Sequence, residues 1–260
     1  MGQPSSSFNA MLVSRQFSLS RQKTLDFVSR LEAVPDKAVS LYLPFNLSMA
    51  DAGDLLDKIS GEHNFPEDLA EVVSGSKNGA VLFWGLERKN LISPPFPIIE
   101  KYISQGYDVE PIRSLLVKDY LIALVLVRLG AYAIGVCQGE RLVTSKVGTG
   151  LVHARHKQGG SSQARFARHR EKQIESFMTR VCGHAREQLE PYAQTIDFMT
   201  YGGARTTILL LQKQCPFLKQ FDDRTLPPLL DIPDPRQAVL EGAVGRIWSS
   251  DVVEWREEES

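Results

Sequence analysis

The sequence has few cysteines, no long apolar run and almost no net charge. Its three cysteines, Cys137, Cys182 and Cys215, stand far apart and form neither a Cys-x-x-Cys pair nor a zinc-ligand spacing. This usage favours a reducing, cytoplasmic location. The longest apolar run, residues 121–129, is too short to span a bilayer and contains Arg128, and the N-terminus has no apolar secretory segment. We therefore expect no contact with a membrane.

The near absence of net charge excludes a generally basic nucleic-acid-binding protein. The 260 residues carry 30 Lys and Arg against 31 Asp and Glu, a formal charge of −1, in an otherwise ordinary globular composition. A site for a polyanion must then come from local charge asymmetry. Residues 153–172 have this asymmetry, because six cations face only Glu171 there: Arg155, Lys157, Arg165, Arg168, Arg170 and Lys172.

Residues 1–115 predict a smaller N-terminal α/β domain. The first residues, rich in Ser and Gln, are expected to be frayed, and residues 107–116 to form a connection. Apolar periodicity predicts helices over residues 22–34, 51–59 and 67–73, and strands over residues 38–43, 79–84 and 90–92.

Residues 116–260 predict a second domain built on a mixed sheet. An antiparallel meander is expected over residues 121–129, 131–137 and 140–147, with Gly130 and Gly139 at its turns. Helices are then predicted over residues 163–189, 204–213 and 235–248, and strands over residues 195–200, 229–232 and 252–255. Strands that alternate with helices after a meander indicate an α/β sheet flanked by helices.

The helix predicted over residues 163–189 has two different faces at 100° per residue. The apolar face contains Phe166, Ile174, Phe177, Val181, Ala185 and Leu189. The opposite face contains Arg165, Arg168, His169 and Lys172.

A Gly-Gly-Ser-Ser-Gln loop precedes this helix within the basic stretch. Gly159 and Gly160 allow the backbone to approach a ligand closely. The Gln163 amide both donates and accepts hydrogen bonds, so it can orient a water without acting as an acid or base. The flanking cations and the positive end of the helix dipole suit phosphates. The alternative reading is a solvated Gly-Ser loop before an exposed basic helix.

The order of these residues resembles archaeal and eukaryotic class I peptide-chain release factors. That family has a Gly-Gly-Gln tripeptide followed by an Arg-Phe-Ala-Arg element, and here residues 165–168 are Arg-Phe-Ala-Arg at the same distance from Gly159 and Gly160. The resemblance extends upstream over residues 115–152 and downstream over residues 199–203. It covers about half of the chain well and the N-terminal part faintly. It implies a ribonuclease H-like mixed sheet flanked by helices.

The loop departs from the release-factor pattern at one point. Ser161 follows Gly160, and the glutamine stands two places later, at Gln163. This Gly-x-x-Gln arrangement is similar to the release-factor-like peptidyl-tRNA hydrolases of ribosome quality control, relatives of the ankyrin-repeat and zinc-finger hydrolases. The resemblance implies hydrolysis of peptidyl-tRNA on stalled large ribosomal subunits. Gln163 would position the attacking water, with Gly159 and Gly160 in the catalytic loop.

The resemblance also implies the partners. Ribosomal RNA and peptidyl-tRNA would be bound by Arg155, His156, Lys157, Arg165, Arg168 and Lys172. We expect no DNA partner, no metal and no organic cofactor, and docking on the ribosome or tRNA by residues 1–115. The resemblance does not extend to decoding motifs or to a domain that recruits a partner GTPase. Two alternatives remain: a non-catalytic ribosome-binding rescue or surveillance factor, and a codon-independent termination factor.

Three other patterns in the sequence suggest a nuclease, a metal site and phosphate-binding turns. A nuclease of this fold needs clustered carboxylates, but Asp119, Glu140, Asp197 and Asp251 show no converging pattern. The His153-x-x-His156 spacing suggests a metal, which the cations Arg155 and Lys157 would repel. The segments 148–150 and 202–205, both containing two glycines, are expected to be turns rather than phosphate cradles.

Overall fold

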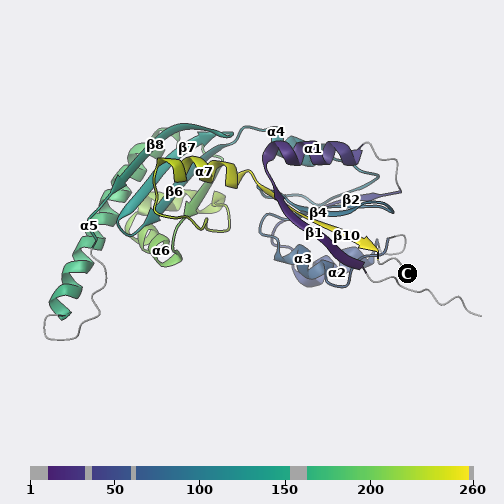
Figure 1. Ribbon diagram of the computed structural model, residues 1–260, viewed down its shortest axis with the longest axis horizontal. Helices are drawn as coiled ribbons and strands as arrows, with labels where there is room; N and C mark the ends of the chain where they lie inside the picture. The colour runs from purple at the N-terminus through teal and green to yellow at the C-terminus, as the bar shows by residue number, and fades with distance from the viewer. Residues whose placement is uncertain (1–10, 33–36, 60–62, 153–162, 258–260) are drawn as a thin grey trace, which may run out of the picture. The chain divides into compact units, whose positions relative to one another are not determined.

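The computed structural model describes residues 11–32, 37–59, 63–152 and 163–257 (Figure 1). Two compact units divide the chain: unit 1 comprises Met1–Val117 and Trp248–Ser260, and unit 2 comprises Lys118–Ile247. The sequence predicted one division at residue 116, with everything after it in the second domain. That assignment is wrong for residues 248–260, because the last strand pairs with strands of unit 1.

Unit 1 is built on a six-stranded antiparallel sheet. The strand order is β1 (Met11–Leu19), β10 (Ser250–Glu257), β4 (Lys89–Ser93), β3 (Ala80–Trp84), β2 (Val39–Leu43) and β5 (Tyr102–Gln105). In this order β10 lies between β1 and β4, with Val13 opposite Trp255 and Val252 opposite Ile92. The two ends of the chain therefore contribute adjacent strands to one sheet.

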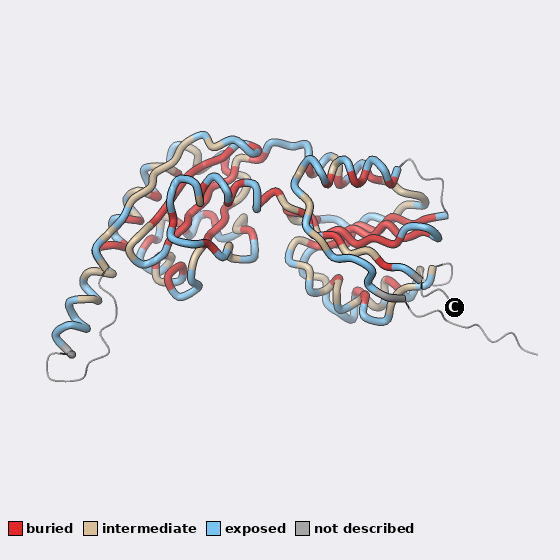
Figure 2. Tube along the Cα trace, viewed as in Figure 1, coloured by how far each residue is buried: buried red, intermediate tan, exposed pale blue. Residues whose placement is uncertain are grey.

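Helices cover both faces of this sheet. Helices α1 (Arg21–Glu32) and α4 (Glu110–Val117) share a core with Val81 and Phe83. Helices α2 (Met49–Asp57) and α3 (Leu69–Gly75) share a core with the alternate residues Leu82 and Trp84. Every residue of β2 and β3 is buried, as Figure 2 shows. Burial on both faces explains why these strands appear in the sequence as continuous apolar runs.

Three elements of unit 1 were not predicted. Strands β1 and β5 form where frayed or irregular chain was expected, and α4 forms within the expected connection. Both strands are edges of the sheet, and β5 is mostly exposed. An edge strand has a weak apolar pattern because only part of its side chains is buried.

Unit 2 is built on a four-stranded mixed sheet of order β8-β7-β6-β9. The meander β6 (Leu121–Arg128), β7 (Ala131–Gln138) and β8 (Arg141–Thr149) is antiparallel, and β9 (Phe198–Gly202) runs parallel to β6. Both predicted turn glycines have positive φ, 100° at Gly130 and 57° at Gly139. The predicted meander is confirmed.

Helices also lie on both faces of the unit 2 sheet. Helices α5 (Gln163–Leu189) and α6 (Arg205–Gln214) and the 3-10 segment η2 (Pro216–Arg224) pack over Val125, Ile134 and Met199. A short 3-10 turn, η1 (Glu190–Tyr192), follows α5. Helix α7 (Gln237–Ile247) covers the other face, where Leu240 lies against Gly135. This arrangement confirms the expected ribonuclease H-like sheet flanked by helices.

Two local predictions in unit 2 need correction. The strand expected over residues 229–232 is reduced to a single bridge between Leu230 and Gly202. Gly148 belongs to β8 rather than to a turn. The turn at residues 202–205 is confirmed: Gly203 has φ 123°, and a Cβ there would lie 2.0 Å from the Val127 carbonyl oxygen.

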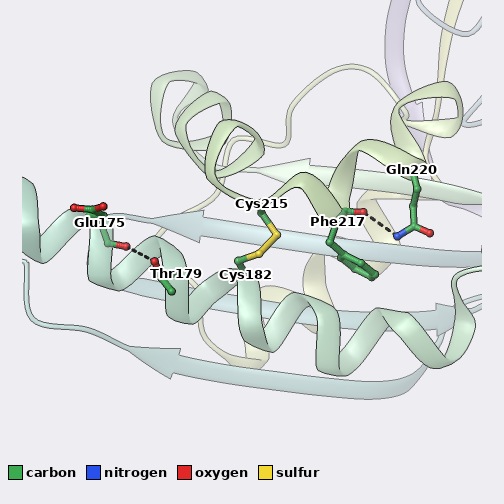
Figure 3. Close-up of a disulfide and its surroundings, with 6 residues drawn as sticks. All are labelled: Glu175, Thr179, Cys182, Cys215, Phe217 and Gln220. Atoms are coloured by element: carbon green, nitrogen blue, oxygen red, sulfur yellow. Dashed lines mark hydrogen bonds between the residues drawn. A yellow bond between two sulfur atoms is a disulfide. The ribbon is translucent and has the colours of Figure 1, made fainter.

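Cys182 of α5 is bonded to Cys215, the residue after α6 (Figure 3). Their spacing of 33 residues gave no reason to pair them, but the packing of α5 against α6 brings their Cα atoms to 5.4 Å. The third cysteine, Cys137, is buried and has a free thiol. Among the described residues, no helix is long and apolar enough to cross a membrane.

Candidate functional site

The basic stretch begins and ends at the edge of the unit 2 core. Val152 and Ile174 both pack against this core. Residues 153–162 between them lie outside the described part of the chain. The roles predicted for Gly159, Gly160, Arg155, His156 and Lys157, and for the His153-x-x-His156 spacing, therefore stay predictions.

The first three turns of α5 extend beyond the sheet. Helix α5 begins at Gln163, as predicted, but its first fully buried residue is Phe177. We call residues 163–173 the arm; at 1.5 Å per residue they place Gln163 about 16 Å along the helix from Ile174. Figure 2 shows residues 165–173 of this arm coloured as exposed or intermediate.

A cationic stripe runs along the arm. It consists of Arg165, Arg168 and Lys172, which are spaced i, i+3 and i+7 and so share one side of the helix. All three side chains are exposed, and none of the described residues forms an ion pair with them. Unneutralised cations on a projecting helix suit a polyanionic partner.

Phe166 lies on the predicted face of α5 but is not buried there. The helical repeat places it on the apolar face with Ile174 and Phe177, and the residue is 57% exposed. The apolar face of α5 continues to Phe166, whereas the described residues that join this face to the core begin at Ile174. Helical periodicity assigns a residue to one face of a helix, but it does not tell where the sheet beneath that face ends.

Two glycines at the end of β8 make close approaches, Gly148 to Tyr132 of β7 and Gly150 to the body of α5. A Cβ on Gly150 would lie 2.2 Å from Arg180 Nη2 and 2.5 Å from Phe177 Cδ2. A Cβ on Gly148 would lie 2.3 Å from the Tyr132 hydroxyl oxygen. These contacts leave little space for larger side chains, and at Gly150 they place the chain directly against α5. Sequence reasoning missed these close approaches, although the Gly-x-Gly spacing was a signal for them.

The body of α5 is fastened to unit 2 by several kinds of contact. Besides its apolar face, the disulfide joins it to the end of α6. His184 stacks on Tyr132 with ring centroids 5.5 Å apart, and its Nδ1 lies 3.0 Å from a carboxylate oxygen of Glu187. This hydrogen bond lowers the pKa of Glu187 below its ordinary value. The arm thus extends from a helix whose remaining turns are packed against unit 2 and joined to it by a disulfide.

Two of the four carboxylates that a nuclease site would draw on, Asp197 and Asp251, make structural contacts. Asp197 accepts a hydrogen bond from the Leu121 N–H at 2.9 Å and lies 3.6 Å from Lys118 Nζ, which fastens β6 beside β9. Asp251 lies on β10 in unit 1, where it accepts a hydrogen bond from Ser18. Within the described ranges, no group of three or more His, Cys, Asp or Glu residues could hold a metal ion.

Comparison with known proteins identifies the family. Residues 120–253 match the family described as Actinobacteria/chloroflexi VLRF1 release factor. Peptide chain release factor subunit 1 of Archaeoglobus fulgidus is 24% identical over 213 residues, 72% of this chain and 52% of the relative. The corresponding protein of Aeropyrum pernix is 29% identical over 134 residues, 48% of this chain and 36% of the relative. The chain thus spans about half or less of the length of these curated relatives.

Solved structures give weaker similarities. The archaeal translation termination factor aRF1 aligns over 88% of this chain and 73% of its own, with 19% identity and a TM-score of 0.38. Archaeoglobus fulgidus Pelota aligns over 89% of this chain and 64% of its own, with 10% identity and a TM-score of 0.29. The sequence match is the decisive one, because it covers more than half of the chain, including β6 to α7. The protein belongs to the Actinobacteria/chloroflexi VLRF1 release factor family.

Proposed function

We propose that this protein is a peptidyl-tRNA hydrolase of ribosome quality control, which frees nascent chains from stalled large ribosomal subunits in the cytoplasm. The observation that carries the proposal is the exposed cationic arm, which begins at Gln163 and extends from a firmly held helix. Membership of a release factor family supports it.

In this proposal Gln163 positions the attacking water. The water oxygen attacks the ester carbonyl carbon, the bond from that carbon to the tRNA ribose oxygen breaks, and a water proton passes to the leaving ribose oxygen. The first-turn N–H groups of a helix have no intrahelical partner, and with the helix dipole they stabilise developing negative charge. Gly159 and Gly160 would let the loop backbone approach the ester closely. Most of the rate gain would come from orientation rather than from acid-base chemistry.

The cations of the basic stretch position the protein in this proposal. The stripe residues, together with Arg155, His156 and Lys157, would contact phosphates of ribosomal RNA and of the tRNA acceptor end. Such contacts fix register and orientation without reading sequence. Residues 1–115, which fall in unit 1, would dock on the ribosome or the tRNA.

A release assay tests the hydrolase proposal. Purified large subunits carrying peptidyl-tRNA are mixed with the protein, and freed peptide is measured over time. We expect Gln163→Ala to bind the subunits normally but to release peptide about 100- to 1000-fold more slowly, the usual loss when one polar group is removed from the transition state. Gln173→Ala, which changes another glutamine of α5, is the matched control and should release at the normal rate.

Two outcomes would contradict the proposal. Full release by Gln163→Ala would remove the glutamine from the mechanism. Binding without release by the unmodified protein would instead favour a non-catalytic rescue factor.

A further inference from the structure

We propose that Phe166 stacks on an unpaired RNA base while the cationic stripe holds the phosphates of the same strand. This inference rests on the proposed function, because it assumes that the arm enters RNA. It specifies that the arm binds single-stranded RNA rather than duplex RNA. Its starting observation is the 57% exposure of Phe166 on a helix whose apolar residues are otherwise covered from Ile174 onward.

The geometry of α5 places the ring and the charges on different sides of the arm. Phe166 and the buried Phe177 are eleven residues apart, close to three full turns, so they point in nearly the same direction. The cationic stripe lies on the other side. Arg170 is four residues after Phe166 and therefore lies on the same side of the helix, one turn away. The arm thus offers an aromatic ring with a guanidinium group beside it, and a stripe of charge behind it.

Phe166 differs from the other exposed apolar residues of unit 2. Among the described residues of this unit it is the only exposed large aromatic; the others are aliphatic, namely Leu129, Val143, Leu151 and Leu209. Aliphatic side chains suit packing against protein, whereas a flat ring also suits the π-face of a base. The exposed aromatic residue in this described part of unit 2 is therefore the one on the arm.

One kind of partner, unpaired RNA, could bind both the exposed ring of Phe166 and the cationic stripe. Unpaired bases stack on aromatic rings and on arginine planes, and the backbone that joins them carries phosphates for cations. Duplex RNA offers phosphates but keeps its base faces covered. A protein partner would need an apolar pocket and an acidic surface together. Unpaired RNA supplies the ring face and the negative charge in every nucleotide.

The test uses a fluorescent reporter at the same position. Phe166→Trp keeps an aromatic ring, and the three native tryptophans, Trp84, Trp248 and Trp255, are buried. The introduced indole is then the exposed one. Titration with a short single-stranded oligoadenylate at low salt should quench its fluorescence saturably. The same strand annealed to its complement should give little quenching.

A substitution series separates stacking from charge. Phe166→Leu keeps apolar volume but removes the ring, so we expect about 5- to 150-fold weaker binding of the single strand, the range for loss of one base stack. The dependence of its affinity on salt should not change, since no phosphate contact is lost. Leu209→Ala, at a similarly exposed site on α6, should bind as the unmodified protein does. An unchanged melting temperature for Phe166→Leu would show that the fold is intact.

Fluorescence measurements on ribosomal complexes distinguish which RNA supplies the stacked base. Quenching of the introduced indole on large subunits without tRNA indicates a ribosomal RNA base, and quenching only with bound tRNA indicates the acceptor end. Normal binding of the single strand by Phe166→Leu would overturn the inference, as would equal quenching by duplex. These measurements do not involve peptide release, so a protein that stacks but does not hydrolyse would refute only the proposed function.

Discussion

Cys137 illustrates how the surroundings of a single residue set its chemistry. The residue lies on β7 in the interior of unit 2, and burial raises the pKa of its thiol to about 12. The thiol therefore stays protonated and shielded at neutral pH. Because the unfolded chain loses this proton at a lower pH, the free energy of unfolding should fall as pH rises above the ordinary thiol pKa of about 8.5.

Thiol titration checks both Cys137 and the disulfide. At pH 8, a chromogenic disulfide reagent should find no reactive thiol in the native protein. In guanidinium chloride without reductant it should find only Cys137, and after reduction it should find all three cysteines. If all three react in denaturant before reduction, Cys182 and Cys215 are not bonded.

Helix α5 shows at the scale of an element how far sequence periodicity reaches. Its bounds agree with the prediction, because an amphipathic pattern of this length defines a helix locally. The function proposed for it depends on where its apolar face stops packing against the core, near Ile174, and this point depends on the length of the strands beneath the helix. The division of α5 into a packed body and an exposed arm is thus a property of the whole of unit 2.

Neutralising the cationic stripe should change how binding depends on salt. We expect the double variant Arg165→Gln, Arg168→Gln to bind large ribosomal subunits more weakly at low salt. The slope of log affinity against log salt should fall by about two, since two phosphate contacts are lost. Lys213→Gln, which removes an exposed cation of α6, is the control and should leave the slope unchanged. An unaltered slope in the double variant would exclude the stripe from RNA binding.

At the scale of the whole molecule, the chain leaves unit 1 at residue 117 and returns to it at residue 248. The returning segment inserts β10 between β1 and β4 and places Trp255 against Trp84, with ring centroids 5.5 Å apart. Trp248 is fully buried, and its ring lies against Phe96 at 4.7 Å and under the Arg21 guanidinium at 4.1 Å. Unit 1 therefore depends on residues that follow unit 2.

Deletion of residues 248–260 should unfold unit 1 and spare unit 2. The deletion removes the strand that joins β1 to β4, so the sheet of unit 1 loses its continuity. Trp84, then the only tryptophan, should become exposed, with a red-shifted emission. Hydrogen exchange should remain slow in β6 and β7, whose partners all lie within residues 118–247. Slow exchange persisting in β3 and β4 would show that unit 1 does not need β10.

Local pattern by itself determined much of this protein. Period and turn residues predicted the meander, α5 and the sheet flanked by helices, because these depend on residues close together in the chain. The order of residues 159–168 pointed to a release factor, and the family match confirmed that level of description. These features could be predicted without knowing which distant segments of the chain are in contact.

Only the tertiary structure decided the rest. The edge strand β1, the transfer of β10 to unit 1, the pairing of Cys182 with Cys215 and the exposure of Phe166 each depend on contacts between distant segments. An edge strand is specified mainly by backbone hydrogen bonds to a neighbour, and a disulfide by the distance between two packed helices. Neither leaves a periodic signal in the chain. The sequence therefore indicated where the loop and helix of the proposed site lie in the chain, and the packing of unit 2 decided which described side chains of the helix are exposed.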